Sequence, residues 1–158
     1  MRNAQPQSPH RIVGAAVVRR GGTVLIARRP EGKLLGGLWE FPGGKRQGRE
    51  SLVGCVQREL KEELGLVVAV GARLGVFTHA YTHFSVTVHA YECSVKRGRP
   101  VAHEHTAIRW VRPERLSGFP MGKVDRQIAR GLQALTGTQH PGGARPRGRA
   151  ARGTRKRG

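Results

Sequence analysis

The chain has 158 residues, a length that suits one domain with its own hydrophobic core. Its hydrophobic fraction is 37%, and neither a membrane span of ~18 apolar residues nor a signal peptide is evident, so a cytoplasmic protein without a membrane partner is expected. The formal net charge of +19 indicates an acidic partner such as a nucleotide, a nucleic acid or another anionic surface.

Two apolar stretches near the N-terminus have the character of strands. Arg11–Arg19 is rich in valine, Thr23–Ala27 is similar, and a Gly-Gly turn separates them, which is typical of a β-hairpin. A loop containing glycine and proline is expected over Pro30–Gly37. The short extended piece Leu38–Phe41 follows and is expected to stop at Pro42-Gly43-Gly44.

The segment Glu50–Leu64 has the spacing of an amphipathic helix. Apolar residues recur in it at steps of three and four, namely Val53, Val56, Leu60 and Leu64. Gly65 follows directly, where glycine commonly ends a helix in the left-handed conformation. The sequence therefore predicts a helix with one buried face that ends before Gly65.

The second half of the chain mixes strands with helical segments. Extended pieces are predicted at Leu66–Val70, Leu74–Phe77, Phe84–Tyr91 and Ala107–Val111. One helical turn is predicted at Pro113–Leu116 and a longer helix at Val124–Leu135, whose apolar residues recur at helical spacing. The class is therefore α/β, and residues 10–136 are expected to form a single domain.

The C-terminal segment differs in composition from everything before it. No acidic residue follows Asp125, and seven basic residues lie between Gln139 and Gly158. A segment rich in Arg and Gly cannot bury a core, so residues 137–158 are predicted to be a disordered basic tail. Its expected partner is nucleic acid, contacted weakly and without sequence preference in a salt-sensitive way. The oligomeric state is left open.

Three of the ten acidic residues of the chain lie within five positions, at Glu59, Glu62 and Glu63. On a helix these side chains fall within roughly 100° of arc, where three like charges repel one another unless a cation is present. Clustered carboxylates suit Mg²⁺ or Mn²⁺, which prefer hard oxygen ligands together with water and substrate phosphates. The alternative is a solvated acidic helix face.

The residues around this patch form a longer pattern. Gly44 and Glu50 precede the helix, Arg58-Glu59-Leu60 and Glu62-Glu63 lie within it, and Gly65-Leu66 closes it. An ion pair between Arg58 and Glu50 is expected to tie the preceding loop to the helix. The pattern spans 23 residues and resembles the Nudix box at every defined position.

The resemblance implies an α/β/α sandwich around a mixed β-sheet and a loop–helix–loop that holds divalent cations against a diphosphate. It assigns Glu59, Glu62 and Glu63 as metal-binding carboxylates, and Gly43 or Gly44 as the source of a backbone carbonyl ligand. The expected cofactor is Mg²⁺, with Mn²⁺ as an alternative. The implied reaction is attack of water on one phosphorus of a nucleoside diphosphate derivative.

The flanks of the box are similar to MutT-type enzymes and to the Nudix-like C-terminal domain of MutY-type adenine glycosylases. The resembling segments are Leu35–Lys45, His79–Phe84 and Trp110–Leu116. The first group implies hydrolysis of 8-oxo-dGTP to the monophosphate and pyrophosphate, which cleans the nucleotide pool. The alternatives are a hydrolase of ADP-ribose or another nucleoside diphosphate derivative, and a non-catalytic reader of 8-oxoguanine in DNA.

Further positions carry over from the MutT type. Glu104 matches an extra carboxylate that reaches the metal site from outside the box, and is added to the catalytic and metal-binding set. The expected substrate contacts are Arg29 or its neighbour Arg28 on the phosphates and Lys123 on the base or a phosphate. Phe41 and Phe84 are expected to contact the base, with core packing as the equal alternative. MutT-type enzymes read the oxidised purine with an asparagine after a Phe-Pro turn. This chain has none after Phe119-Pro120, which leaves base preference open.

Overall fold

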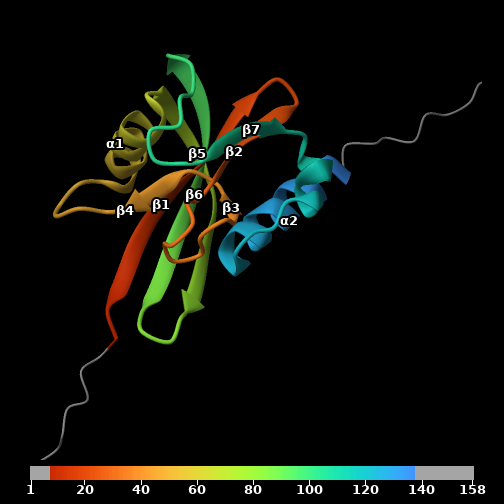
Figure 1. The fold of residues 1–158 in the computed structure, drawn as a ribbon. Helices are drawn as coiled ribbons and strands as arrows, with labels where there is room; N and C mark the ends of the chain where they lie inside the picture. The colour runs from red at the N-terminus through yellow and green to blue at the C-terminus, as the bar shows by residue number, and fades with distance from the viewer. Residues whose placement is uncertain (1–7, 138–158) are drawn as a thin grey trace, which may run out of the picture.

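The computed structural model describes residues 8–137. In chain order the elements are β1 (His10–Arg20), β2 (Thr23–Arg28), β3 (Trp39–Glu40), β4 (Gly43–Lys45), α1 (Leu52–Leu64), β5 (Val67–Ala80), β6 (Ser85–Arg97), β7 (Ala107–Val111), the 3₁₀ helix η1 (Pro113–Gly118) and α2 (Lys123–Gly137). Helix α1 covers one face of the sheet, while η1 and α2 cover the other (Figure 1).

The sheet is mixed because β1 has both kinds of neighbour. Its strand order is β3-β2-β1-β6-β5, with β4 also paired to β1 and β7 to β2. Strands β1 and β6 run parallel over ten residue pairs, whereas the other pairs are antiparallel. The sheet and its covering helices confirm the expected α/β/α sandwich.

Each face of the sheet has its own hydrophobic core, because alternate residues of a strand point to opposite sides. In β1, Ala15 and Val17 pack toward α2, whereas Ala16 and Val18 pack toward α1. Helix α1 contributes Val56, Leu60 and Leu64, and α2 contributes Val124, Ile128, Ala129 and Leu132. The candidate site lies beside β4, where residues of α1 and residues of α2 line one pocket.

The ends of α1 follow the sequence closely. Ser51 accepts a hydrogen bond from the Gly54 backbone N–H at 3.0 Å, as an N-cap residue does. Gly65 ends the helix at φ 67° in the left-handed region, which confirms the predicted stop. Glu50 therefore precedes the helix instead of starting it, and its carboxylate accepts from the Gln47 backbone N–H at 2.8 Å.

Several expectations need correction. The pieces Leu66–Val70 and Leu74–Phe77 belong to one bulged strand, β5, because its pairing with β6 continues through the irregularities. The extended region does not stop at Pro42-Gly43-Gly44: Gly43–Lys45 forms β4 against β1. Val53 is 40% exposed and Leu135 55% exposed, so neither belongs to the buried face of its helix; Cys55 and Ala129 are buried instead.

Among residues 8–137, no helix combines the length and apolarity required to traverse a lipid bilayer. The predicted basic tail, apart from Gly137 at the end of α2, lies outside the described residues. Cys55 and Cys93 are buried and carry free thiols.

Candidate active site

A pocket of about 340 Å³ opens on the α2 side of the sheet, a volume in the range typical of small-molecule sites. It lies between the strand β1, the strands β3 and β4, and the first turn of α2. Its walls also receive two carboxylates from α1 on one side and aromatic rings from the β5–β6 connection on the other. Charged and aromatic groups thus meet in one cavity.

The three glutamates of the box do not lie in equivalent surroundings. Glu59 and Glu63 line the pocket, and Glu63 is only 7% exposed. The side chain of Glu62 is 56% exposed and is not among the pocket's lining residues. The helix therefore delivers two of its three carboxylates to the cavity and leaves the third at the surface.

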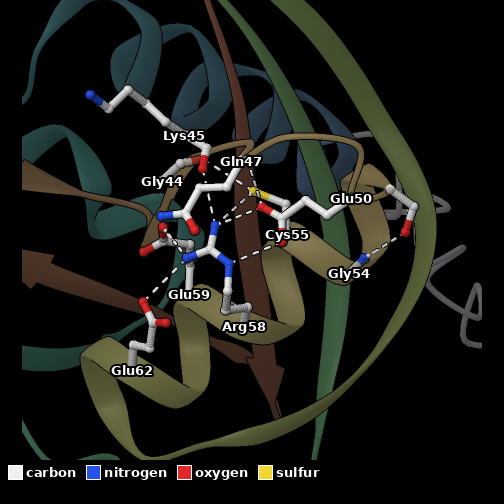
Figure 2. Close-up of polar contacts among 10 residues, drawn as sticks. Gly44, Lys45, Gln47, Glu50, Gly54, Cys55, Arg58, Glu59 and Glu62 are labelled. Atoms are coloured by element: carbon white, nitrogen blue, oxygen red, sulfur yellow. Dashed lines mark hydrogen bonds and ion pairs between the residues drawn. The ribbon is translucent and has the colours of Figure 1, made fainter.

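Arg58 binds several groups of the loop and helix at once (Figure 2). Its Nη2 lies 2.7 Å from Glu50 Oε1 and 3.1 Å from the Lys45 carbonyl, which confirms the predicted Glu50–Arg58 pair. Its Nη1 lies 2.9 Å from Glu59 Oε1 and 3.2 Å from Glu62 Oε2. The hydrogen bonds from Arg58 and the Gln47 backbone lower the pKa of Glu50 to about 2.

The carboxyl group of Glu63 is buried, which disfavours its ionised form. Loss of water around it, followed by the charges of Glu40, Glu59 and Glu104, raises its pKa to about 9, while the Gly43 backbone N–H partly opposes the shift. Its Oε2 is buried and makes no hydrogen bond with any group of residues 8–137. Buried oxygens without a partner are rare in native proteins, so this carboxylate is suited to a cation.

The residues present fit a hard divalent cation. The surrounding donors are carboxylate oxygens, the ligand type that Mg²⁺ and Mn²⁺ prefer. A β-carbon on Gly44 would lie 2.4 Å from Glu59 Cδ, so glycine leaves room for that carboxylate. Across residues 8–137, however, no three acidic, His or Cys side chains already converge as a ligand group. Arg58 accounts for part of this, because it binds both Glu59 and Glu62.

The two glycines of β4 allow close backbone approach. A β-carbon on Gly43 would lie 2.0 Å from the Gly14 carbonyl oxygen of β1, so no other residue fits there. The Gly44 carbonyl accepts a hydrogen bond from Cys55 Sγ at 3.4 Å, which orients it toward α1. Sulfur is a weak donor, so this carbonyl retains acceptor capacity for the expected metal contact.

A small side cavity of about 70 Å³ joins Glu63 to Glu104, Glu40, His105 and Arg29. Glu104, which comes from the loop before β7, thus lies beside Glu63, and its charge raises the Glu63 pKa. Glu40 accepts from His105 Nε2 at 2.9 Å and from Arg29 Nη1 at 3.1 Å. Glu40 was not singled out from the sequence.

The two candidate arginines separate in space. Arg29 lines the pocket, and its Nε donates to the Leu34 carbonyl at 2.8 Å. Arg28 donates to the Gly37 carbonyl at 3.0 Å and lies 3.6 Å from the exposed Glu31, and the pocket walls do not include it. The geometry therefore favours Arg29 for a role on the substrate.

Aromatic rings line the end of the pocket away from α1. Phe41 is buried in the core and contributes one wall, and half-buried Phe84 contributes another. Phe84 stacks on Tyr81 with ring centroids 4.7 Å apart, and the Arg11 guanidinium lies 4.1 Å above it. Flat apolar walls of this kind suit a nucleobase. Lys123 is exposed at the start of α2 and does not line the pocket.

Asp125, in the first turn of α2, places a carboxyl group in the wall of the pocket. Its Oδ1 accepts from the Phe41 backbone N–H at 3.0 Å, which fixes the carboxyl group. Loss of water around it, and next the charge of Glu40, raise its pKa to about 7. The group is therefore able to accept or donate a hydrogen bond near neutral pH.

The sequence held a signal for Asp125 but only a weak one for Glu40. Asp125 shares a helix face with the buried Ala129, and a carboxylate on the apolar face of a helix points to function. Glu40 lies in a segment of two residues paired to β2, where periodicity carries no information. Only the packing of β3 against the loop before β7 brings it to the site.

The NUDIX domain family model matches residues 14–131 of the chain. The chain is 35% identical over 123 residues to the CTP pyrophosphohydrolase of Escherichia coli (strain K12), covering 78% of this chain and 91% of that protein. It is 36% identical over 138 residues to the "Putative 8-oxo-dGTP diphosphatase 2" of Mycobacterium tuberculosis (strain ATCC 25618 / H37Rv), with coverage of 83% and 96%.

Solved structures agree with these relatives. The solution structure of the E. coli ORF135 protein superposes with a TM-score of 0.73 at 32% sequence identity, covering 85% of this chain and 96% of that one. Sequence and structure comparisons therefore point to the same family.

Proposed function

This chain belongs to the NUDIX domain family as a MutT-type hydrolase, and from that premise we propose that it cleaves a nucleoside triphosphate with Mg²⁺ to the monophosphate and pyrophosphate. Residues 10–136 are the proposed catalytic domain, which extends slightly beyond the matched region 14–131. The reaction consumes one water molecule and breaks one phosphoanhydride bond.

One observation carries this proposal. Glu63 lines both the nucleotide-sized cavity and the small cavity of Glu40 and Glu104, and one of its oxygens makes no hydrogen bond within the described part of the chain. Such a group is costly in a resting protein and useful in one that binds a cation there. The aromatic end of the same cavity supplies a place for the base, so both ends of a nucleotide are accommodated.

The proposed metal-holding residues are Glu59, Glu63 and Glu104, with Glu62 and a carbonyl of Gly43 or Gly44 completing the set. When bound, Mg²⁺ supplies charge neutralisation at the phosphoryl oxygens and at the leaving group. Arg58 positions Glu59 and Glu62 and ties the loop of Glu50 to α1. A carboxylate of the set that is not bound to the cation accepts the proton lost by the attacking water.

Arg29 is the proposed contact for the substrate phosphates, because it lines the pocket beside Glu59 and Glu63. Its guanidinium offers donors in a geometry that matches phosphate oxygens. Phe41, Phe84 and Tyr81 are the proposed walls around the base. Arg28 and Lys123 are assigned no substrate contact.

For the base, 8-oxo-dGTP is the first candidate and CTP the second. The M. tuberculosis relative supports the first, and the E. coli CTP pyrophosphohydrolase supports the second. Asp125 is compatible with both. A carboxylate accepts two hydrogen bonds from the N1–H and N2–H₂ groups of a guanine ring, or one from the cytosine N4 amine. The activity serves removal of an unwanted or damaged nucleotide from the pool.

The deciding experiment is a substrate panel with 8-oxo-dGTP, dGTP, CTP, dCTP and ADP-ribose in Mg²⁺, followed by chromatography of the products. Hydrolysis in ¹⁸O-labelled water locates the attacked phosphorus by mass spectrometry. We expect monophosphate and pyrophosphate, with the label confined to one product. Release of inorganic phosphate as the first product, or no turnover of any compound, would contradict the proposal.

Metal dependence needs its own measurement. Calorimetric titration of the metal-free protein with Mg²⁺ and with Mn²⁺ should show binding that Glu63→Gln weakens, independently of turnover. A protein that hydrolyses nothing and binds duplex DNA containing 8-oxoguanine tightly would instead be a lesion reader, the non-catalytic alternative.

A further inference from the structure

His105 is a buried side chain beside the site to which the proposed chemistry assigns no role. Its Nε2 lies 2.9 Å from Glu40 Oε1, and its side chain is only 4% exposed. Arg29 Nη1 lies 3.1 Å from Oε2 of the same carboxylate. Glu40 therefore accepts a hydrogen bond on each oxygen, from a histidine on one side and from an arginine on the other.

The sheet fixes the backbones of both partners. Glu40 in β3 pairs with Ala27, and Ala107 in β7 pairs with Arg28, so β2 lies between the two strands. The Thr106 backbone N–H donates to the Arg28 carbonyl at 3.0 Å and anchors the residue next to His105. The imidazole thus reaches Glu40 at the end of β2 from a well-fixed position.

Stability alone does not favour a histidine at this position. Its Nδ1 is buried and makes no hydrogen bond within the described part of the chain. A buried polar atom without a partner destabilises the folded state, and an apolar side chain of similar size avoids that penalty. The contact that histidine makes and an apolar residue cannot make is the one between Nε2 and Glu40.

Glu40 itself lies among like charges. Its charge raises the pKa of both Glu63 and Asp125, so the three carboxyl groups are close enough to repel. Without a second donor, the Glu40 carboxylate is free to rotate away from Arg29. Among residues 8–137, the Arg29 guanidinium in turn donates hydrogen bonds to two groups, the Glu40 carboxylate and the Leu34 carbonyl at 2.8 Å.

We propose that His105 is a positioning residue: by holding Glu40 it fixes the Arg29 guanidinium at the junction of the nucleotide pocket and the carboxylates. The inference rests on the proposed role of Arg29 on the substrate phosphates. A guanidinium fixed before binding loses less conformational freedom when phosphate arrives, so the contact strengthens binding.

The test compares His105→Leu, which removes the donor but keeps the volume, with His105→Gln, whose amide N–H replaces Nε2–H. We expect His105→Leu to raise KM, and the Kd of inorganic pyrophosphate measured in Mg²⁺, about tenfold, the lower end of effects seen when an outer partner of a site is removed. The turnover number kcat should change little, because the interaction acts in the ground state as well. His105→Gln should restore most of the loss.

Two comparisons make the test specific. His103→Ala changes an exposed histidine on the other side of Glu104 and should leave every constant unchanged. In an Arg29→Ala background, His105→Leu should have almost no further effect, because the two act through one path. The positioning role would be overturned if the effects of His105→Leu and Arg29→Ala on KM were fully additive. It would also be overturned if His105→Leu lowered kcat and left pyrophosphate binding unchanged.

Folding and function are separated by spectroscopy. If His105→Leu unfolds, the contact can still be tested by comparing the ¹⁵N spectra of the wild type and of Glu40→Gln. The signal of the His105 Nε2–H group should differ between these two proteins. An unmoved signal contradicts the proposal. Absence of turnover with every nucleotide would overturn the proposed hydrolase while leaving pyrophosphate binding and the imidazole signal measurable.

Discussion

The two halves of the site are built in different ways. On the α1 side, Arg58 binds Glu50, Glu59 and Glu62, none of which lies more than eight positions away from it in one loop and helix. On the α2 side, the pocket joins Phe41, Phe84 and Asp125, whose positions span much of the chain. The first half is local in sequence, and the second exists only in the folded domain.

This difference separates chemistry from selectivity. A local box keeps its geometry in any protein that retains the helix and its loop, so it can serve many substrates unchanged. The pocket depends on how α2 docks and on the β5–β6 connection, which can vary without disturbing α1. Changes on the α1 side should therefore reduce turnover or stability, and changes on the α2 side should alter preference among nucleotides.

Of all the substitutions on the α1 side, Glu63→Gln should reduce turnover most. We expect kcat to fall at least about 10²-fold, the scale found when one preorganised charge-stabilising group is removed. Burial raises the Glu63 pKa from 4.5 to about 9, so unfolding of the metal-free protein releases a proton in this window and its stability falls as pH rises from 4.5 to 9. At pH 8 without metal, the variant should therefore have a higher Tm than the wild type.

The matched control is Glu62→Gln, which changes an exposed glutamate four positions after Arg58. It should leave the metal-free Tm nearly unchanged at every pH. A metal-free Glu63→Gln protein that is no more stable than the wild type at pH 8 would contradict the burial argument.

Arg58→Ala should lower the free energy of unfolding, since it removes the shared hydrogen-bond partner of Glu50, Glu59 and Glu62. Urea denaturation measures this change. The pKa of Glu50 is lowered from 4.5 to about 2, so the pair's contribution is present above pH 4.5 and is lost as pH falls toward 2. The acid-induced loss of stability should be smaller in the variant.

The conservative variant Arg58→Lys sharpens this test. Lysine keeps the charge but not the fork that reaches Glu50, Glu59 and Lys45 together. It should recover only part of the stability, and full recovery would mean that charge alone accounts for the effect.

Asp125→Asn should change the ranking of substrates by roughly tenfold, within the 1–3 kcal/mol that a bidentate base contact supplies. The ratio of kcat/KM for 8-oxo-dGTP and CTP measures it. The folded-state pKa is raised from 3.8 to about 7, so the wild type loses stability as pH rises through this window. That loss should be absent in the variant, and an unchanged substrate ratio would remove Asp125 from base reading.

Arg28→Ala and Lys123→Ala should have the smallest effects. Both side chains are exposed and lie outside the walls of the pocket, so kcat/KM should stay within about twofold of the wild type. Arg29→Ala, tested beside Arg28→Ala, should raise KM clearly. Equal effects of the two arginine variants would contradict the separation seen at the end of β2.

The sequence predicted the elements better than their continuity. Helix α1 agrees with the pattern because periodicity and a terminal glycine define it locally, and the strand Ala107–Val111 agrees as well. The long strand β5 was predicted as two pieces, since its bulges interrupt the alternation that identifies a strand. The strand β4 was missed because Gly-Gly is also the signature of a turn.

By itself, the sequence determined the class of fold and the chemical character of the α1 side. Carboxylates spaced on one helix face, with Arg58 and Glu50 in register, specify their own neighbours through helix geometry. Only the tertiary structure decided that Glu63 is buried and Glu62 exposed, that Arg29 and not Arg28 faces the pocket, and that Glu40, Asp125 and His105 join the site. These choices depend on strand pairing and helix docking between distant segments, which no local spacing records.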